Sequence, residues 1–264
     1  MKVRLQLMLA VLLDLAVGKE LRAQWTERPS DSELAAISER GRELAAYDQA
    51  VWHATDALQT ANPKTAQGQR CLARFANGSW IVVFGSLNAD KTRFSIDYEA
   101  LQGSKPRAFS VKREELLRED SDFYLFAARA VETALADFGG TSRPYNAAIL
   151  PTGDQQFHVY LYPAPLKANS YPLGGDVRYL ISGDGKQILQ KSVLHKTIIE
   201  VSAAKAKKGV ASSHTHVLSD FPEDTDVLHV LQQDPPSPEM VATPHFVYEI
   251  SADGTIRIKH GKKR

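Results

Sequence analysis

Three short turns that contain glycine, each set between two largely apolar stretches, constrain the fold of this chain most strongly. The turns are Asn77-Gly78, Gly183-Asp184-Gly185 and Asp253-Gly254. Such pairs favour tight turns between antiparallel strands, because their backbones tolerate the positive φ that these turns need. They predict hairpins over residues 69–85, 176–200 and 246–259. Further short strands are predicted at 93–98, 148–151 and 157–162.

Two helices are predicted among these strands. Ser30 and Glu33 have the spacing of a capping box, and the apolar stripe that follows predicts a helix to about Thr60. A second helical pattern runs from near Lys112 to Phe138 and ends at two glycines. Because strands outnumber helices and hairpins join neighbours, we expect an α+β fold. It should have mainly antiparallel sheets, one long N-terminal helix and one central helix.

The first 23 residues have the pattern of an export signal. Lys2 and Arg4 precede an apolar run, Leu5 to Val17, that is shorter than the roughly 20 residues needed to span a bilayer. We therefore predict a signal peptide over 1–23 and an exported protein, periplasmic or secreted, with no transmembrane span in the mature chain. Asp14 within the apolar run supports the alternative of an ordinary N-terminal helix.

The remaining chain is predicted to form two α+β regions, 24–143 and 144–264, with a single continuous domain as the alternative. A length of 264 residues with 43% hydrophobic residues provides enough core for either. The net charge of +1 gives no reason to expect nucleic acid as a partner. Cys71 is the only cysteine, which excludes an internal disulfide and a cysteine-based zinc site. We interpret it as a small core residue, with a catalytic thiol as the alternative.

Two histidines one residue apart, His214 and His216, form the stretch best suited to chemistry. In an extended strand, residues i and i+2 point to the same face, so both imidazoles can reach one metal ion. Pro222 and the acids after it predict a helix start that places Asp226 one turn into a helix. His214, His216 and Asp226 are therefore predicted to bind zinc.

The sequence also offers other candidate ligands for the metal ion. These are Asp220, His229 and His195, although His229 could instead orient a ligand through a hydrogen bond. His195 and His158 lie in strand patterns, and we interpret both as core or edge histidines. No Gly-x-Ser-x-Gly motif, glycine-rich phosphate loop or dinucleotide fingerprint occurs in the sequence.

The segment from His214 to Asp226 resembles the JAMM-type zinc hydrolases, which cleave peptide or isopeptide bonds. That family carries His-x-His-Pro, a loop, and then Pro-Ser-x-x-Asp at the start of a helix. The resemblance implies that His214, His216 and Asp226 hold zinc and that water fills a fourth position. Val217 stands where the family has proline, and Glu223 stands where it has serine. The loop is about two residues shorter than in the family, as judged from this motif spacing.

Two hypotheses from different classes follow. The first is an exported zinc-dependent hydrolase of peptide or isopeptide bonds, or an inactive relative that keeps the metal. Its general base is not identified, and the candidates are Glu200, Asp176 and Glu223. The second is a non-catalytic envelope module that binds a peptide, a glycan or a partner protein through its sheets.

Overall fold

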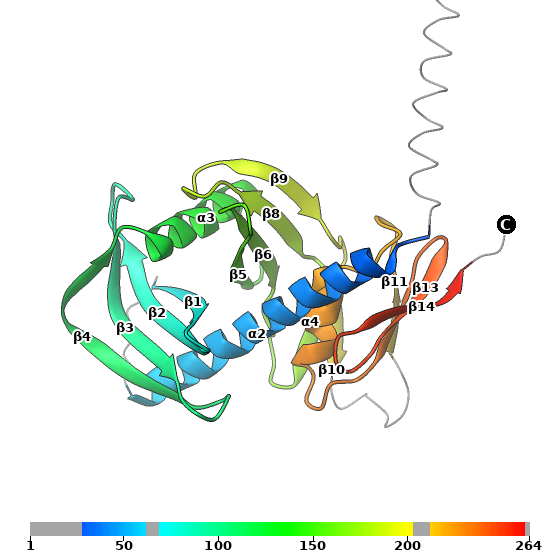
Figure 1. Ribbon diagram of the computed structural model, residues 1–264, viewed down its shortest axis with the longest axis horizontal. Helices are drawn as coiled ribbons and strands as arrows, with labels where there is room; N and C mark the ends of the chain where they lie inside the picture. Colours follow the sequence, from blue (N-terminus) through cyan, green and yellow to red (C-terminus); the bar gives the residue numbers. More distant parts are fainter. Residues whose placement is uncertain (1–27, 62–68, 203–211, 262–264) are drawn as a thin grey trace, which may run out of the picture.

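The computed structural model describes residues 28–61, 69–202 and 212–261 (Figure 1). Within these ranges the helices are α2 (Asp31–Ala61), α3 (Phe123–Phe138) and α4 (Asp224–Gln232). Most strands belong to three four-stranded sheets, and most neighbours pair antiparallel. The predicted α+β class, with a long N-terminal helix and a central helix, is confirmed. The predicted signal peptide at 1–23 lies outside the described residues. None of the helices described is long and apolar enough to cross a membrane.

Helix α2 starts where its capping box predicts. The Ser30 hydroxyl accepts the Glu33 N–H at 3.2 Å, and the Glu33 carboxylate accepts the Ser30 N–H at 2.8 Å. These bonds satisfy two of the donors that a helix start leaves free. The helix runs diagonally across the molecule, from the first sheet to α4 and the C-terminal strands (Figure 1). It therefore links the two ends of the fold.

The first sheet has the order β1-β2-β3-β4. Its strands are β1 (Arg70–Ala76), β2 (Ser79–Leu87), β3 (Phe94–Gln102) and β4 (Phe109–Asp120). Asn77 and Gly78 both have positive φ, 53° and 78°, as a tight turn of the predicted hairpin requires.

The prediction of a helix from Lys112 is wrong for its first part. Residues 109–120 instead form β4, which pairs antiparallel with β3. Only one residue of the predicted apolar stripe, Leu116, precedes Phe123, so the local helical preference is weak and the available edge of β3 prevails. The Asp120 carboxylate accepts the N–H groups of Tyr124 and Leu125 at 2.9 and 3.1 Å, and this fixes the start of α3.

The second sheet has the order β5-β6-β8-β9, beside a separate pair of β7 and β10. The strands are β5 (Tyr145–Pro151), β6 (Phe157–Pro163), β7 (Ser170–Leu173), β8 (Val177–Ile181), β9 (Ile188–Val193) and β10 (Ile199–Ser202). The predicted strand over 187–200 is thus interrupted at 194–198. There the N–H groups of Leu194 and His195 donate to the Asp176 carbonyl at 3.0 and 3.5 Å. The chain leaves the sheet at this point because the backbone N–H groups of Leu194 and His195 donate to the Asp176 carbonyl.

The third sheet contains the only parallel strand pair among the described residues. Its order is β11-β12-β13-β14, with β11 (Ser212–Thr215), β12 (Glu239–Ala242), β13 (Phe246–Ile250) and β14 (Ile256–Gly261). Strands β11 and β12 are parallel, and α4 lies between them in the chain. The predicted late hairpin is confirmed as β13 and β14. Strand β12 was not predicted, because it follows the proline-rich stretch over 234–238.

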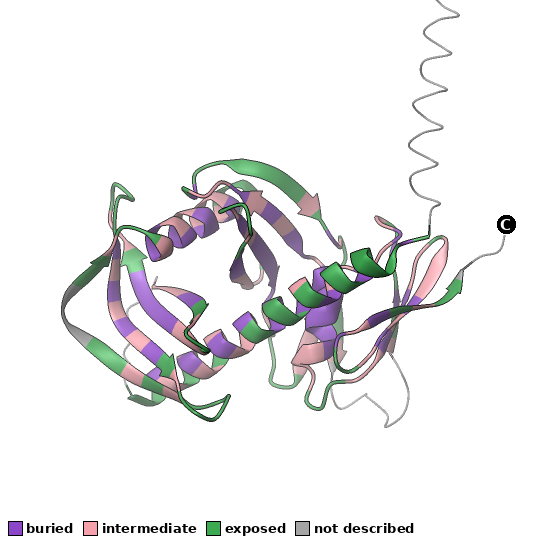
Figure 2. Cartoon of the chain, viewed as in Figure 1, coloured by how far each residue is buried: buried purple, intermediate pink, exposed green. Residues whose placement is uncertain are grey.

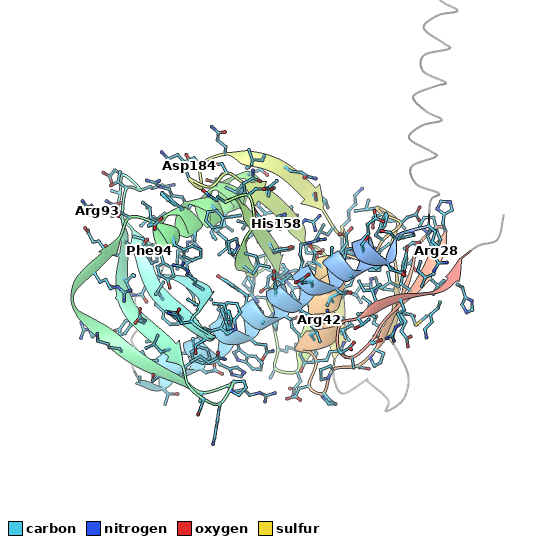
Figure 3. All side chains as sticks on the ribbon, viewed as in Figure 1. Arg28, Arg42, Arg93, Phe94, His158 and Asp184 are labelled. Carbon is cyan, nitrogen blue, oxygen red and sulfur yellow. The ribbon has the colours of Figure 1, made fainter. Side chains whose placement is uncertain are left out.

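Helix α2 packs on the turn of this late hairpin. Arg42, which is labelled on α2 in Figure 3, donates to the Asp253 carbonyl and to the Thr255 hydroxyl, each at 2.8 Å. Gly254 has a φ of 78°, and a Cβ there would lie 2.9 Å from a Val227 methyl group. The turn therefore requires glycine both for its backbone and for its contact with α4.

Two groups of buried apolar side chains form the interior (Figure 2). The larger one joins α2, the first two sheets and α3, and so continues across residue 143. The smaller one packs α4 and the third sheet against Leu34 of α2. The predicted division near residue 143 stays a prediction, and the core does not separate there.

Candidate metal centre

Four side chains converge in a buried space between the second sheet and α4. They are His195, His214, His216 and Asp226, and their ligand atoms all lie within 4.8 Å of one another. The Nε2 atom of His216 lies 2.8 Å from that of His195 and 2.9 Å from that of His214. Asp226 Oδ1 lies 3.1 Å from His214 Nε2 and 3.3 Å from His195 Nε2. The group could hold a metal ion.

The two histidines of the His-x-His stretch reach this space as the sequence predicts. His214 lies in β11, and His216 follows directly, with its N–H donating to the Ala242 carbonyl of β12 at 2.8 Å. The backbone therefore stays extended through both residues. This is why the two rings emerge on one face, with exposed side-chain fractions of only 5% and 2%.

Asp226 comes from the first turn of α4, again as predicted. Its Oδ2 accepts the Glu223 N–H at 2.7 Å and lies 3.1 Å from His216 Nε2. A carboxylate at a helix start is stabilised by the helix dipole. Its Oδ1 is buried and has no hydrogen-bond partner, although it faces the imidazoles of His214 and His195. A buried carboxylate oxygen of this kind requires a cation or a proton.

His195 completes the group, whereas its strand pattern led us to interpret it as a core or edge residue. It lies in the loop after β9, and its Nδ1–H donates to Asp176 Oδ1 at 2.7 Å. Gly174 and Gly175 have φ of 82° and 71°, and a Cβ on Gly174 would lie 2.3 Å from the Thr197 carbonyl oxygen. These glycines allow the loop to lie close against the start of β8. The Gly-Gly-Asp sequence was the available signal for this bend.

Each imidazole is oriented by a partner on its far side. The Nδ1 atoms of His195, His214 and His216 contact Asp176, Glu239 Oε1 at 3.0 Å, and the Phe221 carbonyl at 2.8 Å, respectively. These acceptors place the ring hydrogen on Nδ1 and leave each Nε2 lone pair directed at the shared centre. Hydrogen bonds of this type typically orient metal-bound histidines. Glu239 was missed from the sequence because β12 was not predicted.

When no metal ion is bound, protons on the imidazoles supply the positive charge at this centre. Burial disfavours the charged form of His195, but the adjacent Asp226 carboxylate and the hydrogen bond to Asp176 raise its pKa to about 11. Burial likewise opposes charge on His214, yet the adjacent Asp226 carboxylate and the hydrogen bond to Glu239 raise its pKa to about 9. Burial alone would raise the pKa of Asp226, but the neighbouring imidazoles hold it well below its usual value. The centre therefore attracts positive charge.

The three candidates for a catalytic base lie in different settings. Glu200 is half exposed and bonded to Arg143 at 2.6 Å and to Ser170 at 2.9 Å, so the structure gives it a surface ion pair. Asp176 is buried and orients His195. Glu223 precedes α4, where burial and the nearby Asp226 raise its pKa to about 7.

The remaining candidate ligands stay outside the group. The Asp220 carboxylate accepts His245 Nδ1–H at 2.6 Å. His229 is buried, and its Nε2 lies 3.8 Å from Glu239 Oε2. Burial lowers the pKa of His229, which keeps the ring neutral. Cys71 packs against the core, as predicted, and burial raises its pKa to about 12.

The donor set fits a tetrahedral metal ion. Ligands of one tetrahedral zinc ion lie about 3.3 Å apart, given bonds of about 2.0–2.1 Å. Neighbouring ligand atoms are 2.8 to 3.3 Å apart and need only small movements to reach that spacing. Three imidazole nitrogens and one carboxylate also match the ligand preference of zinc.

Comparisons of the chain with models of protein families, with curated proteins and with solved structures found no match.

Proposed function

We propose that this protein binds one zinc ion through His195, His214, His216 and Asp226, and that the ion stabilises the fold. The observation that carries the proposal is the convergence of three imidazole Nε2 atoms on the Asp226 carboxylate, whose buried Oδ1 lacks a hydrogen-bond partner. Imidazole nitrogens and a carboxylate gather in this way around protons or a metal ion, and a metal ion can use all four groups as ligands at once.

The number of protein ligands supports a structural rather than a catalytic ion. Structural zinc sites have four protein ligands, whereas catalytic sites keep one position for water. In this chain His195 Nε2 lies 2.8 Å from His216 Nε2, in the position that the resemblance to JAMM-type hydrolases would give to water. With four protein donors around it, zinc would have no free position from which to supply a hydroxide.

Zinc at this centre would join segments that are distant in the chain. His195 belongs to the loop after β9, His214 to β11, and Asp226 to α4. Because the site exists only in the folded protein, the free energy of zinc binding adds to the free energy of folding. The ion would thus fix the β11–α4–β12 unit against the second sheet.

The test is the zinc content of the full chain and of two variants. After incubation with zinc and desalting, elemental analysis should find one zinc per wild-type chain and per His53→Ala chain. His53 lies on α2 and stacks on Trp52, so this variant controls for loss of a histidine. The His214→Ala/His216→Ala variant should retain none. Equal zinc in all three proteins, with circular dichroism showing that each is folded, would reject the proposal.

A zinc-dependent hydrolase is the second candidate function. It is favoured by the His-x-His and Asp226 spacing and by Glu223, whose pKa is raised to about 7 by burial and by Asp226. This function requires His195 to leave the ion so that water can bind. Chelator-sensitive cleavage of a peptide or isopeptide substrate by the zinc-loaded wild type would establish it. No cleavage by the wild type is the result that the structural role predicts.

We also propose that the protein is exported, with the segment over 1–23 as its signal peptide. Lys2, Arg4 and the apolar run to Val17 support this proposal. Any peptide or protein that it binds would then lie outside the cytoplasm. The test is to express the full chain in a bacterium, to fractionate the cells and to sequence the N-terminus of the recovered protein. An uncleaved chain in the cytoplasmic fraction would contradict it.

A further inference from the structure

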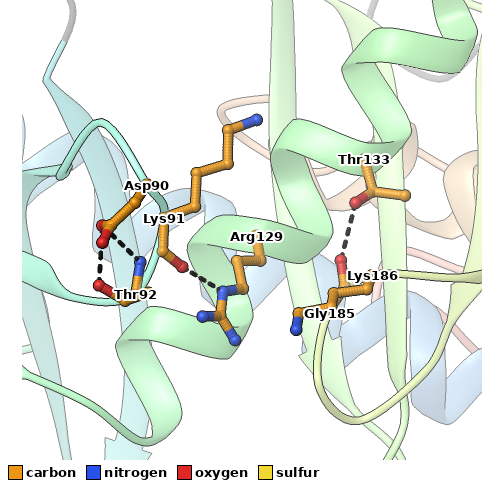
Figure 4. A pocket seen from close by; sticks show the side chains of 7 residues that line it. All are labelled: Asp90, Lys91, Thr92, Arg129, Thr133, Gly185 and Lys186. Atoms are coloured by element: carbon orange, nitrogen blue, oxygen red, sulfur yellow. Dashed lines mark hydrogen bonds between the residues drawn. The ribbon is translucent and has the colours of Figure 1, made fainter.

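A second candidate site lies far from the metal centre, where turns of the first and second sheets meet on α3. An open pocket of about 320 Å³ lies there between the β2–β3 turn, the β8–β9 turn and one side of the helix (Figure 4). Its lining residues are Asp90, Lys91, Thr92, Arg129, Thr133 and Gly185, together with Lys186. The volume is at the lower end of the range for small-molecule sites.

The walls of this pocket are held in place by hydrogen bonds to α3. Arg129 Nε donates to the Lys91 carbonyl at 2.6 Å, and the Thr133 hydroxyl donates to the Gly185 carbonyl at 2.7 Å. Figure 4 shows Arg129 between the two turns. Gly185 has a φ of 76°, and a Cβ there would lie 2.7 Å from Arg129 Cβ, so the second turn is pressed against the helix. The pocket is therefore formed before any ligand binds.

The lining has a net positive charge, because it holds three basic side chains and one carboxylate. It includes Lys91, Arg129 and Lys186, and none of these three forms an ion pair with a carboxylate in the described part of the chain. Asp90 is the only acid in the lining, and its Oδ1 accepts the Thr92 hydroxyl at 2.7 Å and the Thr92 N–H at 3.3 Å. The nearby Asp184 accepts the Ser182 hydroxyl and the Lys186 N–H. Both carboxylates are thus occupied within their own turns.

We propose that this pocket binds a phosphate group, either as free phosphate or as part of a small phosphorylated molecule. Arg129 uses Nε for the Lys91 carbonyl, and the structure gives its two Nη groups no hydrogen-bond partner among the described residues. Guanidinium groups bind phosphate oxygens through paired hydrogen bonds, and ammonium groups add charge at the rim. Three cations around a preformed pocket match the charge and the several acceptor oxygens of a phosphate.

The experiment follows the backbone amide resonances of Thr92 and Gly185 in the zinc-loaded full chain by NMR. The protein is titrated with inorganic phosphate, with glycerol phosphate and with sodium chloride, all at matched ionic strength. Saturable shifts are expected with phosphate, with a Kd on the order of 1 mM. Tighter binding of glycerol phosphate would identify a phosphorylated molecule as the ligand type, and equal or weaker binding would identify free phosphate.

Two double variants with the same net charge make the test specific. Lys91→Gln/Lys186→Gln should weaken phosphate binding by about tenfold or more, because two charged groups of the rim are lost. Lys105→Gln/Lys167→Gln removes two exposed lysines elsewhere and should leave binding unchanged. All four lysines are exposed, so the variants should keep their fold. Equal weakening in both variants, or shifts that chloride reproduces, would overturn the proposal.

Discussion

Replacement of Asp176 with alanine should weaken zinc binding although Asp176 is not itself a ligand. Its Oδ1 accepts His195 Nδ1–H at 2.7 Å, and its carbonyl accepts the Leu194 N–H at 3.0 Å. The alanine variant keeps the carbonyl but loses the acceptor that orients the imidazole. Loss of such a partner typically lowers metal affinity by about 10–100-fold. This corresponds to about 1.4–2.7 kcal/mol of binding free energy.

The lower zinc affinity should also reduce the stability that zinc confers on the folded protein. At a free zinc concentration of about 100 times the wild-type Kd, zinc stabilises the folded wild type by about 2.7 kcal/mol. For the Asp176→Ala protein at the same zinc concentration, the stabilisation falls to about 0.4–1.4 kcal/mol. A chain of this size changes its Tm by about 2–4 °C for each kcal/mol. The zinc-dependent rise in Tm should therefore shrink by about half or more.

The assay combines competition with a fluorescent zinc indicator and thermal unfolding with zinc or with chelator. Asp176 is buried, so its loss also destabilises the metal-free protein, and only the difference between the zinc and chelator curves is compared. Asp154→Ala, on the exposed β5–β6 turn, is the control and should behave as wild type. A zinc affinity for Asp176→Ala equal to that of wild type would refute the assignment of His195 as a ligand held by Asp176.

Three further experiments concern Gly174, Cys71 and the protons bound at the metal centre. Gly174→Ala should destabilise the protein by about 1–3 kcal/mol in urea unfolding, because its φ of 82° and the close Thr197 carbonyl oppose a Cβ. Gly140→Ala should leave the free energy of unfolding nearly unchanged, because open space surrounds Gly140. Equal destabilisation by the two substitutions would contradict this explanation. Burial raises the pKa of Cys71 to about 12, so its thiol stays protonated at pH 8. It should resist iodoacetamide until the protein unfolds, and rapid labelling of the native state would disagree. Because the pKa values of His195 and His214 are raised to about 11 and about 9, zinc binding at pH 7 should displace about two protons. Zinc affinity should therefore rise with pH. Calorimetry in buffers of different ionisation enthalpy measures the number of protons released, and a release of no protons would contradict the prediction.

The elements that could be predicted from the sequence are those with local causes. The capping box of Ser30 and Glu33 sets the start of α2, and Asn77-Gly78 sets the first hairpin. Strands β4 and β12 were not predicted, because they exist through pairing with β3 and with β11 and β13. Such pairing depends on where distant segments lie, which a short sequence window does not contain.

In the candidate site, too, the residues that lie close together in the sequence could be predicted, and the distant one could not. His214, His216 and Asp226 lie within 13 residues of one another, and strand and helix periodicity suffices to bring them together. His195 depends on a loop whose path is set by Gly174, Gly175 and Asp176. The sequence pattern around His195 is that of one continuous strand, so His195 was only a further candidate ligand and not one of the three predicted ligands.

X-ray absorption spectroscopy of the zinc-loaded full chain would count the ligands of the proposed zinc ion. Four protein ligands predict four nitrogen or oxygen neighbours at about 2.0–2.1 Å, with the multiple-scattering signature of three imidazoles. The His195→Ala variant should show two imidazoles. A wild-type spectrum with only two imidazoles, or with a fifth ligand at similar distance, would contradict the closed centre.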